Sequence, residues 1–283
     1  MTPRFTPQDT LPRRWLLGLF GVMLSGCASL STPSSTDPAN PAPKPSRYLD
    51  TQELPDSKNL LPPHPTQGAA AMALDEEISQ RSFALRDTSR WALARTDADV
   101  SFPNAADTFS CALNAPVTEA DTPYLYQLLL RTRDDLGYST RSAKKHAQRP
   151  RPFVVNHEPI CTPEYQAQMF KESSYPSGHA TVGWGWALIL AELSPQHANA
   201  VLARGLAYGE SRNVCNVHWH SDVVQARSVA AATVAVLHSK AAFRAEMEAA
   251  RAELLVVRSQ GMKPRRDCAA EAAALSQLPS LAQ

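Results

Sequence analysis

The chain has 283 residues, of which 43% are hydrophobic and 19% are charged, with 28 Lys and Arg against 27 Asp and Glu. This length supports a buried core, whereas a net charge of +1 excludes a bulk electrostatic case for nucleic-acid binding, which needs a concentrated basic face. A mean hydropathy of -0.30, without repeated long apolar runs, excludes a polytopic membrane protein.

The N-terminus has the pattern of an export signal. Three arginines precede a short apolar stretch, residues 15–24, which runs into Leu24-Ser25-Gly26-Cys27. This end resembles the bacterial lipobox, in which cleavage before the cysteine leaves that cysteine lipid-modified. We therefore expect residues 1–26 to be a lipoprotein signal peptide and Cys27 to carry a lipid anchor. Ala28 stands where an Asp would indicate inner-membrane retention, so we expect an outer-membrane lipoprotein with a periplasmic domain in the bacterial cell envelope.

Proline content changes sharply after this signal. Twelve of the 23 prolines lie in residues 1–66. Residues 27–67 are also rich in Ser, Thr and Asn, a composition that cannot bury a core. We expect residues 27–67 to form an extended tether and residues 68–283 to form the catalytic domain.

The five cysteines leave one that cannot pair within the chain, and the expected lipid anchor accounts for Cys27. An exported chain favours disulfides among the other four, for which three connectivities are open. Of these we favour Cys111–Cys161 with Cys215–Cys268. Because the chain has no CxxC pair and no Cys/His cluster, we expect no metal site and no cofactor.

From residue 68 onward, apolar residues recur mostly every three or four positions, and alternating strand patterns are scarce. The fold class expected is all-α, a helical bundle. Residues 180–193 are apolar nearly all round, which is typical of a buried central helix, and Trp184 and Trp186 are expected to pack there. Helices are expected over residues 69–95, 121–136, 180–193, 196–211, 219–238 and 240–258.

Three polar clusters interrupt this pattern. Lys144 and Arg151 are two cations seven residues apart, and both can bind an oxyanion. In Pro176-Ser177-Gly178-His179, Ser177 can cap the following helix, whose free N–H groups form an anion site. In the third cluster, His218 and Asp222 are four residues apart and share a helix face, so Asp222 can orient the imidazole. Taken singly, each cluster is typical of an ordinary solvated surface.

Taken in order, the clusters read Lys-x6-Arg-Pro, Pro-Ser-Gly-His and Ser-Arg-x5-His-x3-Asp. This order resembles the tripartite signature of the phosphatidic acid phosphatase type 2 superfamily, which also includes the vanadium haloperoxidases. The blocks Ser-Tyr-Pro-Ser-Gly-His and Gly-Glu-Ser-Arg-x-Val-Cys-x-x-His-Trp-x-Ser-Asp resemble those of the bacterial class A nonspecific acid phosphatases. The chain departs from that pattern at Ala147, Ser174, Ala180 and Asn216, the last of which stands where Gly is frequent.

The resemblance implies a metal-independent acid phosphatase that hydrolyses phosphate monoesters with broad specificity. It implies that His218 attacks phosphorus to form a phosphohistidine, that Asp222 orients His218, and that His179 protonates the leaving oxygen. It further implies that Lys144, Arg151, Arg212, Ser177 and Gly178 hold the phosphate. No role is implied for His146 or His220, which are expected at the surface or behind the site.

Small phosphate monoesters are the partners expected from this resemblance, with the lipid anchor as the sole membrane contact and no nucleic-acid binding. It also leaves room for phosphate transfer to alcohols and for a homo-oligomer. A reaction that needs one neutral and one protonated histidine favours a mildly acidic optimum. Three alternatives stay open: a vanadium-dependent haloperoxidase, a lipid or pyrophosphate phosphatase, and an envelope lipoprotein that binds phosphate without turnover.

Overall fold

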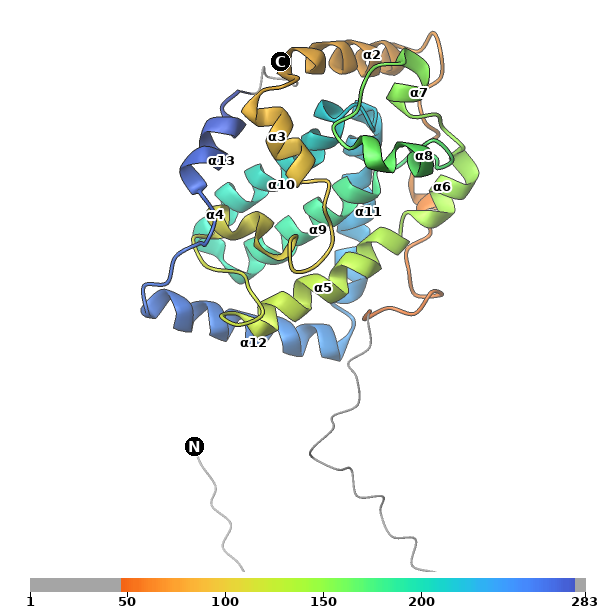
Figure 1. The fold of residues 1–283 in the computed structure, drawn as a ribbon. Helices are drawn as coiled ribbons and strands as arrows, with labels where there is room; N and C mark the ends of the chain where they lie inside the picture. Colours follow the sequence, from red (N-terminus) through yellow and green to blue (C-terminus); the bar gives the residue numbers. More distant parts are fainter. Residues whose placement is uncertain (1–46, 278–283) are drawn as a thin grey trace, which may run out of the picture. The chain divides into compact units, whose positions relative to one another are not determined.

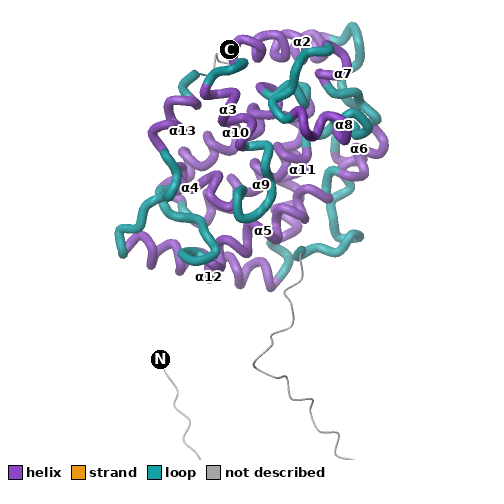
Figure 2. Tube along the Cα trace, viewed as in Figure 1, coloured by secondary structure: helices purple, strands orange, loops and turns teal. Residues whose placement is uncertain are grey.

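The computed structural model describes residues 47–277, which form helices joined by loops, without a strand among them (Figure 2). The expected all-α fold is confirmed. The expected signal peptide, Cys27 and the first part of the tether lie outside the described residues. No helix in the described ranges is long and apolar enough to cross a membrane.

Helix α9 (Gly178–Leu193) forms the centre of the helical unit. Its Trp186 is fully buried, and the indole Nε1 donates to the Leu129 carbonyl at 3.1 Å. The neighbours of α9 are α5 (Pro123–Tyr138), α10 (Ala198–Val214) and α11 (His220–Leu237), and α12 (Ala241–Ser259) covers α5 (Figure 1). A helix that is apolar on every face is stable only where other helices cover all of those faces, so this segment lies at the centre of the unit.

These five helices match the expected ranges to within three residues at each end. The expectation of a single helix over residues 69–95 is wrong: α2 (Ala70–Ser82) passes through a short 3₁₀ turn and stops before α3 (Ser89–Thr96). Asp87 adopts a left-handed conformation with φ of 61°, and the Thr88 hydroxyl accepts the Trp91 N–H at 3.4 Å to start α3. The remaining helices are α1 (Ser57–Leu60), α4 (Ser110–Leu113), α6 (Arg141–Ala147), α7 (Pro152–Asn156), α8 (Gln166–Met169) and α13 (Cys268–Leu275).

Residues 47–67 pack against the helical unit. The main-chain N–H groups of Tyr48 and Leu49 donate to the Asp135 carboxylate at 3.0 and 3.1 Å, and Leu49 and Leu61 are buried. This differs from the expected extended tether up to residue 67, because these side chains find an apolar surface to cover. Among the described residues, the packed unit begins near Tyr48 rather than at residue 68.

The two disulfides join Cys111 to Cys268 and Cys161 to Cys215, so the favoured connectivity is wrong. Cys268 starts α13, which brings it within 5.4 Å (Cα–Cα) of Cys111 in α4. Cys161 lies 4.8 Å from Cys215, at the end of α10. Both separations suit a disulfide, and both follow from tertiary packing that Cys spacing does not encode.

Gly183 allows α9 and α10 to approach closely. A Cβ at this position would lie 2.1 Å from Cδ1 of the Tyr208 ring, which is itself fully buried. By contrast, a Cβ at Gly137 in α5 would meet no atom within 4 Å.

We predict that Gly183→Ala lowers the free energy of unfolding by about 1–3 kcal/mol, because the added methyl overpacks a rigid contact. Gly137→Ala is the matched control and should gain up to about 1 kcal/mol from helix propensity alone. Chemical denaturation of both variants measures the difference. A Gly183→Ala protein as stable as the wild type would contradict the close contact with Tyr208.

Candidate active site

The three sequence clusters converge on one pocket of about 370 Å³. Their pocket-lining members come from three helices and two loops: Lys144 (α6), Arg151 (just before α7), Gly178 and His179 (start of α9), Arg212 (α10) and His218 (before α11). Residues more than seventy positions apart in the chain thus share one cavity wall.

Main-chain hydrogen bonds hold the clusters against one another. The Ser174 N–H donates to the Arg149 carbonyl at 2.9 Å, which joins the first cluster to the second. The Ser177 N–H donates to the Asp222 carbonyl at 3.0 Å, and the Trp219 indole donates to the Pro150 carbonyl at 2.9 Å. Each cluster is therefore fixed relative to the other two.

His218 is buried, and both of its ring nitrogens have partners. Nδ1 lies 3.3 Å from Oδ2 of Asp222, and Nε2 lies 3.0 Å from the Arg151 guanidinium. Because a guanidinium can only donate, Nε2 must accept, and the ring proton therefore belongs on Nδ1. His218 presents an unprotonated Nε2 to the pocket.

Asp222 does not line the pocket but lies behind His218, fully buried. Its Oδ2 also accepts the Trp219 N–H at 2.8 Å, which satisfies one free donor at the start of α11. His218 precedes that helix, so the pair meets across a helix start and does not share a helix face as expected.

The pocket concentrates positive charge. The Lys144 ammonium donates to the Ser173 carbonyl at 2.6 Å, and the Arg151 guanidinium donates to the Met169 and Val217 carbonyls, each at 3.0 Å. Burial, with Arg151 as the second cause, lowers the pKa of Lys144 to about 7. Burial and then the charges of Arg151 and Lys144 lower the pKa of His218 well below its usual value. His218 therefore stays neutral in mildly acidic solution.

His179 lies at the start of α9, where its Nε2 is 3.0 Å from the Ala98 carbonyl. A carbonyl accepts only, so Nε2 carries a proton and Nδ1 is the nitrogen left for exchange. Burial, and then Arg212, lower the pKa of His179 to about 3, whereas the bond to Ala98 acts in the opposite direction. His179 is therefore neutral in mildly acidic solution.

Ser177 does not reach the pocket wall. It is fully buried, and its hydroxyl accepts the Ala180 N–H at 3.2 Å as the N-cap of α9. Gly178 does line the pocket, and a Cβ there would have no neighbour in the chain closer than 4.0 Å. The protein fold itself therefore leaves room for a side chain at residue 178.

Sequence reasoning missed part of the pocket wall. Residues 98–101, Tyr165 and Glu172 line it from outside the three clusters, and no local pattern marks them. Asn216 was noted only as a departure from Gly. It has a φ of 59°, a left-handed conformation that favours Gly or Asn, and its amide bonds to the side chain of Asn156 at 2.9 and 3.1 Å. His146 is exposed and His220 half-buried, and neither lines the pocket.

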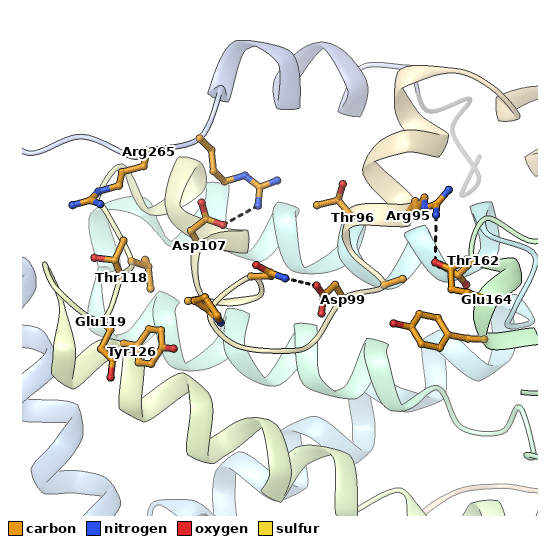
Figure 3. A pocket seen from close by; sticks show the side chains of 17 residues that line it. Arg95, Thr96, Asp99, Asp107, Thr118, Glu119, Tyr126, Thr162, Glu164 and Arg265 are labelled. Atoms are coloured by element: carbon orange, nitrogen blue, oxygen red, sulfur yellow. Dashed lines mark hydrogen bonds and ion pairs between the residues drawn. The ribbon is translucent and has the colours of Figure 1, made fainter. Parts of the chain in front are cut away.

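A larger cavity of about 720 Å³ adjoins the pocket and shares Ala98, Asp99, Thr162 and Tyr165 with it. In Figure 3, Asp99 lies between Asp107 on one side and Thr162 and Glu164 on the other. Each arginine that lines this cavity has a carboxylate partner: Arg95 with Glu164, Arg265 with Asp121, and Arg266 with Asp107. Each of its arginines is thus paired with a carboxylate, whereas in the smaller pocket Arg151 pairs with Glu172 at 3.6 Å and Lys144 and Arg212 donate to carbonyls.

The donor set of the smaller pocket is cationic and imidazole-based. In the part of the chain that the structure describes, no three His, Cys, Asp or Glu side chains gather as they would to hold a metal ion.

Comparison with known proteins places this geometry in a family. The model of the PAP2 superfamily matches residues 126–245. A non-specific acid phosphatase of Providencia stuartii is 39% identical over 207 residues, which cover 73% of this chain and 84% of that protein. An acid phosphatase of Zymomonas mobilis is 42% identical over 208 residues, 72% of this chain and 77% of that protein.

A non-specific acid phosphatase of Salmonella typhimurium is 38% identical over 208 residues, 73% of this chain and 83% of that protein. The haloperoxidase and lipid-phosphatase alternatives gain no support from these three names. The matched family model covers the start of α9, the end of α10 and the start of α11, where the pocket lies. The chain belongs to the non-specific acid phosphatases of the PAP2 superfamily.

Proposed function

We propose that the chain hydrolyses phosphate monoesters through a phosphohistidine formed on His218, without a metal ion. The observation that carries this proposal is the state of His218: a neutral ring with its proton directed to Asp222 and its Nε2 facing a cationic pocket. Such a nitrogen is a competent nucleophile in acidic solution, where an ordinary histidine would be protonated.

In the first step Arg151 turns its N–H from Nε2 of His218 to a phosphoryl oxygen, the freed lone pair of Nε2 forms a bond to phosphorus, and the bond from phosphorus to the ester oxygen breaks. Lys144, Arg151 and Arg212 offset the charge of the phosphoryl oxygens, with Gly178 beside them. The leaving oxygen takes a proton from Nδ1 of His179, whose Nε2 stays bonded to the Ala98 carbonyl. In the second step His179 accepts a proton from water, which attacks phosphorus and releases His218.

The low pKa of His179 in the free protein bears on the pH dependence. A bound phosphate adds negative charge beside the ring and so favours its protonation, which a monoanionic ester can also supply. Acidic solution supplies that proton more readily, and His218 is kept neutral by its cationic neighbours. The proposal therefore includes a mildly acidic optimum.

Broad specificity follows from where the contacts lie. The phosphate side of the pocket holds the cations, whereas the side shared with the larger cavity, which has a volume of about 720 Å³, presents four unlike side chains, those of Ala98, Asp99, Thr162 and Tyr165, and so leaves space for ester groups of different size. An alcohol that enters from this side could replace water as the acceptor, which would give phosphate transfer.

The location of the protein rests on its N-terminal pattern. We propose that Cys27 carries a lipid that holds the domain on the outer membrane, facing the periplasm. The two disulfides support export, because such bonds persist in oxidising compartments.

We predict that His218→Gln lowers kcat on an aryl phosphate by about a thousandfold or more, because it removes the nucleophile. The assay includes a chelator. His146→Gln is the matched control: this histidine is exposed, and its removal should leave kcat within about twofold. Retained activity in His218→Gln would contradict the nucleophile, and loss of wild-type activity with chelator would contradict metal independence.

His179→Ala tests the general acid. We predict that kcat/KM falls by about 100-fold or more for an alkyl phosphate, whose leaving oxygen needs a proton, and far less for 4-nitrophenyl phosphate. The measurement is the fall in kcat/KM for the alkyl phosphate divided by the fall for 4-nitrophenyl phosphate. We use kcat/KM because it reports the step in which the phosphohistidine forms. Equal losses for both esters would remove His179 from that step.

Lys144 should link anion binding to pH. A bound dianion raises its pKa from about 7, so its contribution to binding is complete below pH 7 and is lost as the pH rises through the bound-state value. We predict that sulfate, whose charge is constant, binds more weakly above about pH 7, by up to about tenfold per pH unit. Calorimetry measures this, and an unchanged slope in Lys144→Gln would assign it to another group.

A further inference from the structure

Behind Asp222 lies a second layer of buried charge that the mechanism above does not use. Arg149 has 2% of its side chain exposed, and its NH1 donates to Oδ1 of Asp222 at 2.6 Å. Its NH2 donates at 2.7 Å to Oδ2 of Asp75, a residue of α2 with 1% of its side chain exposed. One guanidinium thus bridges two carboxylates, and neither Arg149 nor Asp75 lines the pocket.

The two carboxylate oxygens of Asp222 have different hydrogen-bond partners. Oδ2 receives the His218 ring and the Trp219 N–H, at 3.3 and 2.8 Å. Oδ1 receives Arg149. A carboxylate held by one oxygen could rotate about its last bond, whereas the planar fork of Arg149 fixes that rotation. The direction of Oδ2 toward His218 therefore depends on what holds Oδ1.

Asp75 in turn holds Arg149 and the start of α11. Its Oδ1 accepts the Ser221 N–H at 2.7 Å, and its Oδ2 accepts the Ser221 hydroxyl at 2.6 Å. The same hydroxyl accepts from Arg149 at 2.8 Å. Asp75 thus holds the guanidinium through NH2, whereas Asp222 accepts from NH1.

Arg149 and Asp75 also determine the net charge behind the His218 imidazole. Arg149 alone would neutralise Asp222 and leave His218 facing only the cations of the pocket. Asp75 balances Arg149, so the row of three ionised groups keeps one net negative charge behind the imidazole. That charge stabilises the positive ring formed when Nε2 bonds to phosphorus.

We propose that Arg149 and Asp75 are positioning residues for the nucleophile: together they hold the Asp222 carboxylate turned toward His218. This inference rests on the proposed role of His218. It gives a function to one residue inside the first sequence cluster and to another that lies far outside all three.

The test is Asp75→Asn, which keeps the shape of the side chain and removes its charge. We expect the single-turnover rate constant for phosphoenzyme formation, measured by rapid quench on the full chain, to fall between about 10-fold and 100-fold. The dissociation constant for sulfate should stay within about threefold, because the cationic wall is untouched. A rate constant does not depend on the fraction of folded protein, so a purely structural role would leave it unchanged.

Glu246→Gln is the matched control. Glu246 pairs with Arg131 at 2.7 Å, with 5% and 8% of their side chains exposed, and neither residue lines the pocket. The Glu246→Gln protein should be less stable than the wild type, whereas its rate constant for phosphoenzyme formation should be unchanged. A wild-type rate constant in Asp75→Asn would overturn the inference.

If Asp75→Asn does not fold, Arg149→Lys carries the test. A lysine keeps the charge but cannot bridge both carboxylates, so we expect the same slowing. A wild-type rate constant in Arg149→Lys would overturn the inference. Absence of any phosphoenzyme in the wild type would instead overturn the proposed function, so the two failures are distinguishable.

Discussion

Repulsion between cations held close together in a buried pocket is the constraint on which the site depends. Each cation is oriented by main-chain carbonyls: Lys144 by Ser173, Arg151 by Met169 and Val217, and Arg212 by Ala94. A carbonyl directs a donor without cancelling its charge, so the positive potential stays available to an incoming anion. Burial first, and then the same potential, lower the pKa of both histidines.

The charges on the two sides of the His218 ring are arranged differently. In front of it, the cations of the pocket donate to carbonyls, and Arg151 also pairs with Glu172 at 3.6 Å. Behind it, Asp222, Arg149 and Asp75 alternate in sign at 2.6 and 2.7 Å. Removing one member of a buried alternating row leaves an uncompensated charge, which is costly. The imidazole of His218 therefore lies between a pocket lined by cations and a buried row of three charges whose sum is negative.

The sequence predicts those helices that are determined by the spacing of apolar residues within the helix itself. The apolar segment 180–193 can only be a central helix, and five expected helices lie close to their observed bounds. The break at Asp87 and Thr88 escapes prediction because a left-handed residue and a cap interrupt a continuing apolar pattern. Six pocket residues could be named from the three motifs, whereas residues 98–101 of the pocket wall, the disulfide pairs and the contact of Asp75 with Arg149 exist only once distant segments pack.

The bond between Cys111 and Cys268 has a topological consequence. It closes a ring across 157 residues of sequence separation, and every motif residue from Lys144 to Asp222 lies inside it. In the chain-entropy description a ring of this size restricts the unfolded chain by roughly 5 kcal/mol. A single backbone cut within the ring leaves both pieces covalently joined, so a protease would nick the site without releasing part of it. Asp75 lies outside the ring, so trimming of the N-terminus that stops before Ala98 would remove the outer support of Asp222 and leave every pocket-lining residue in the chain.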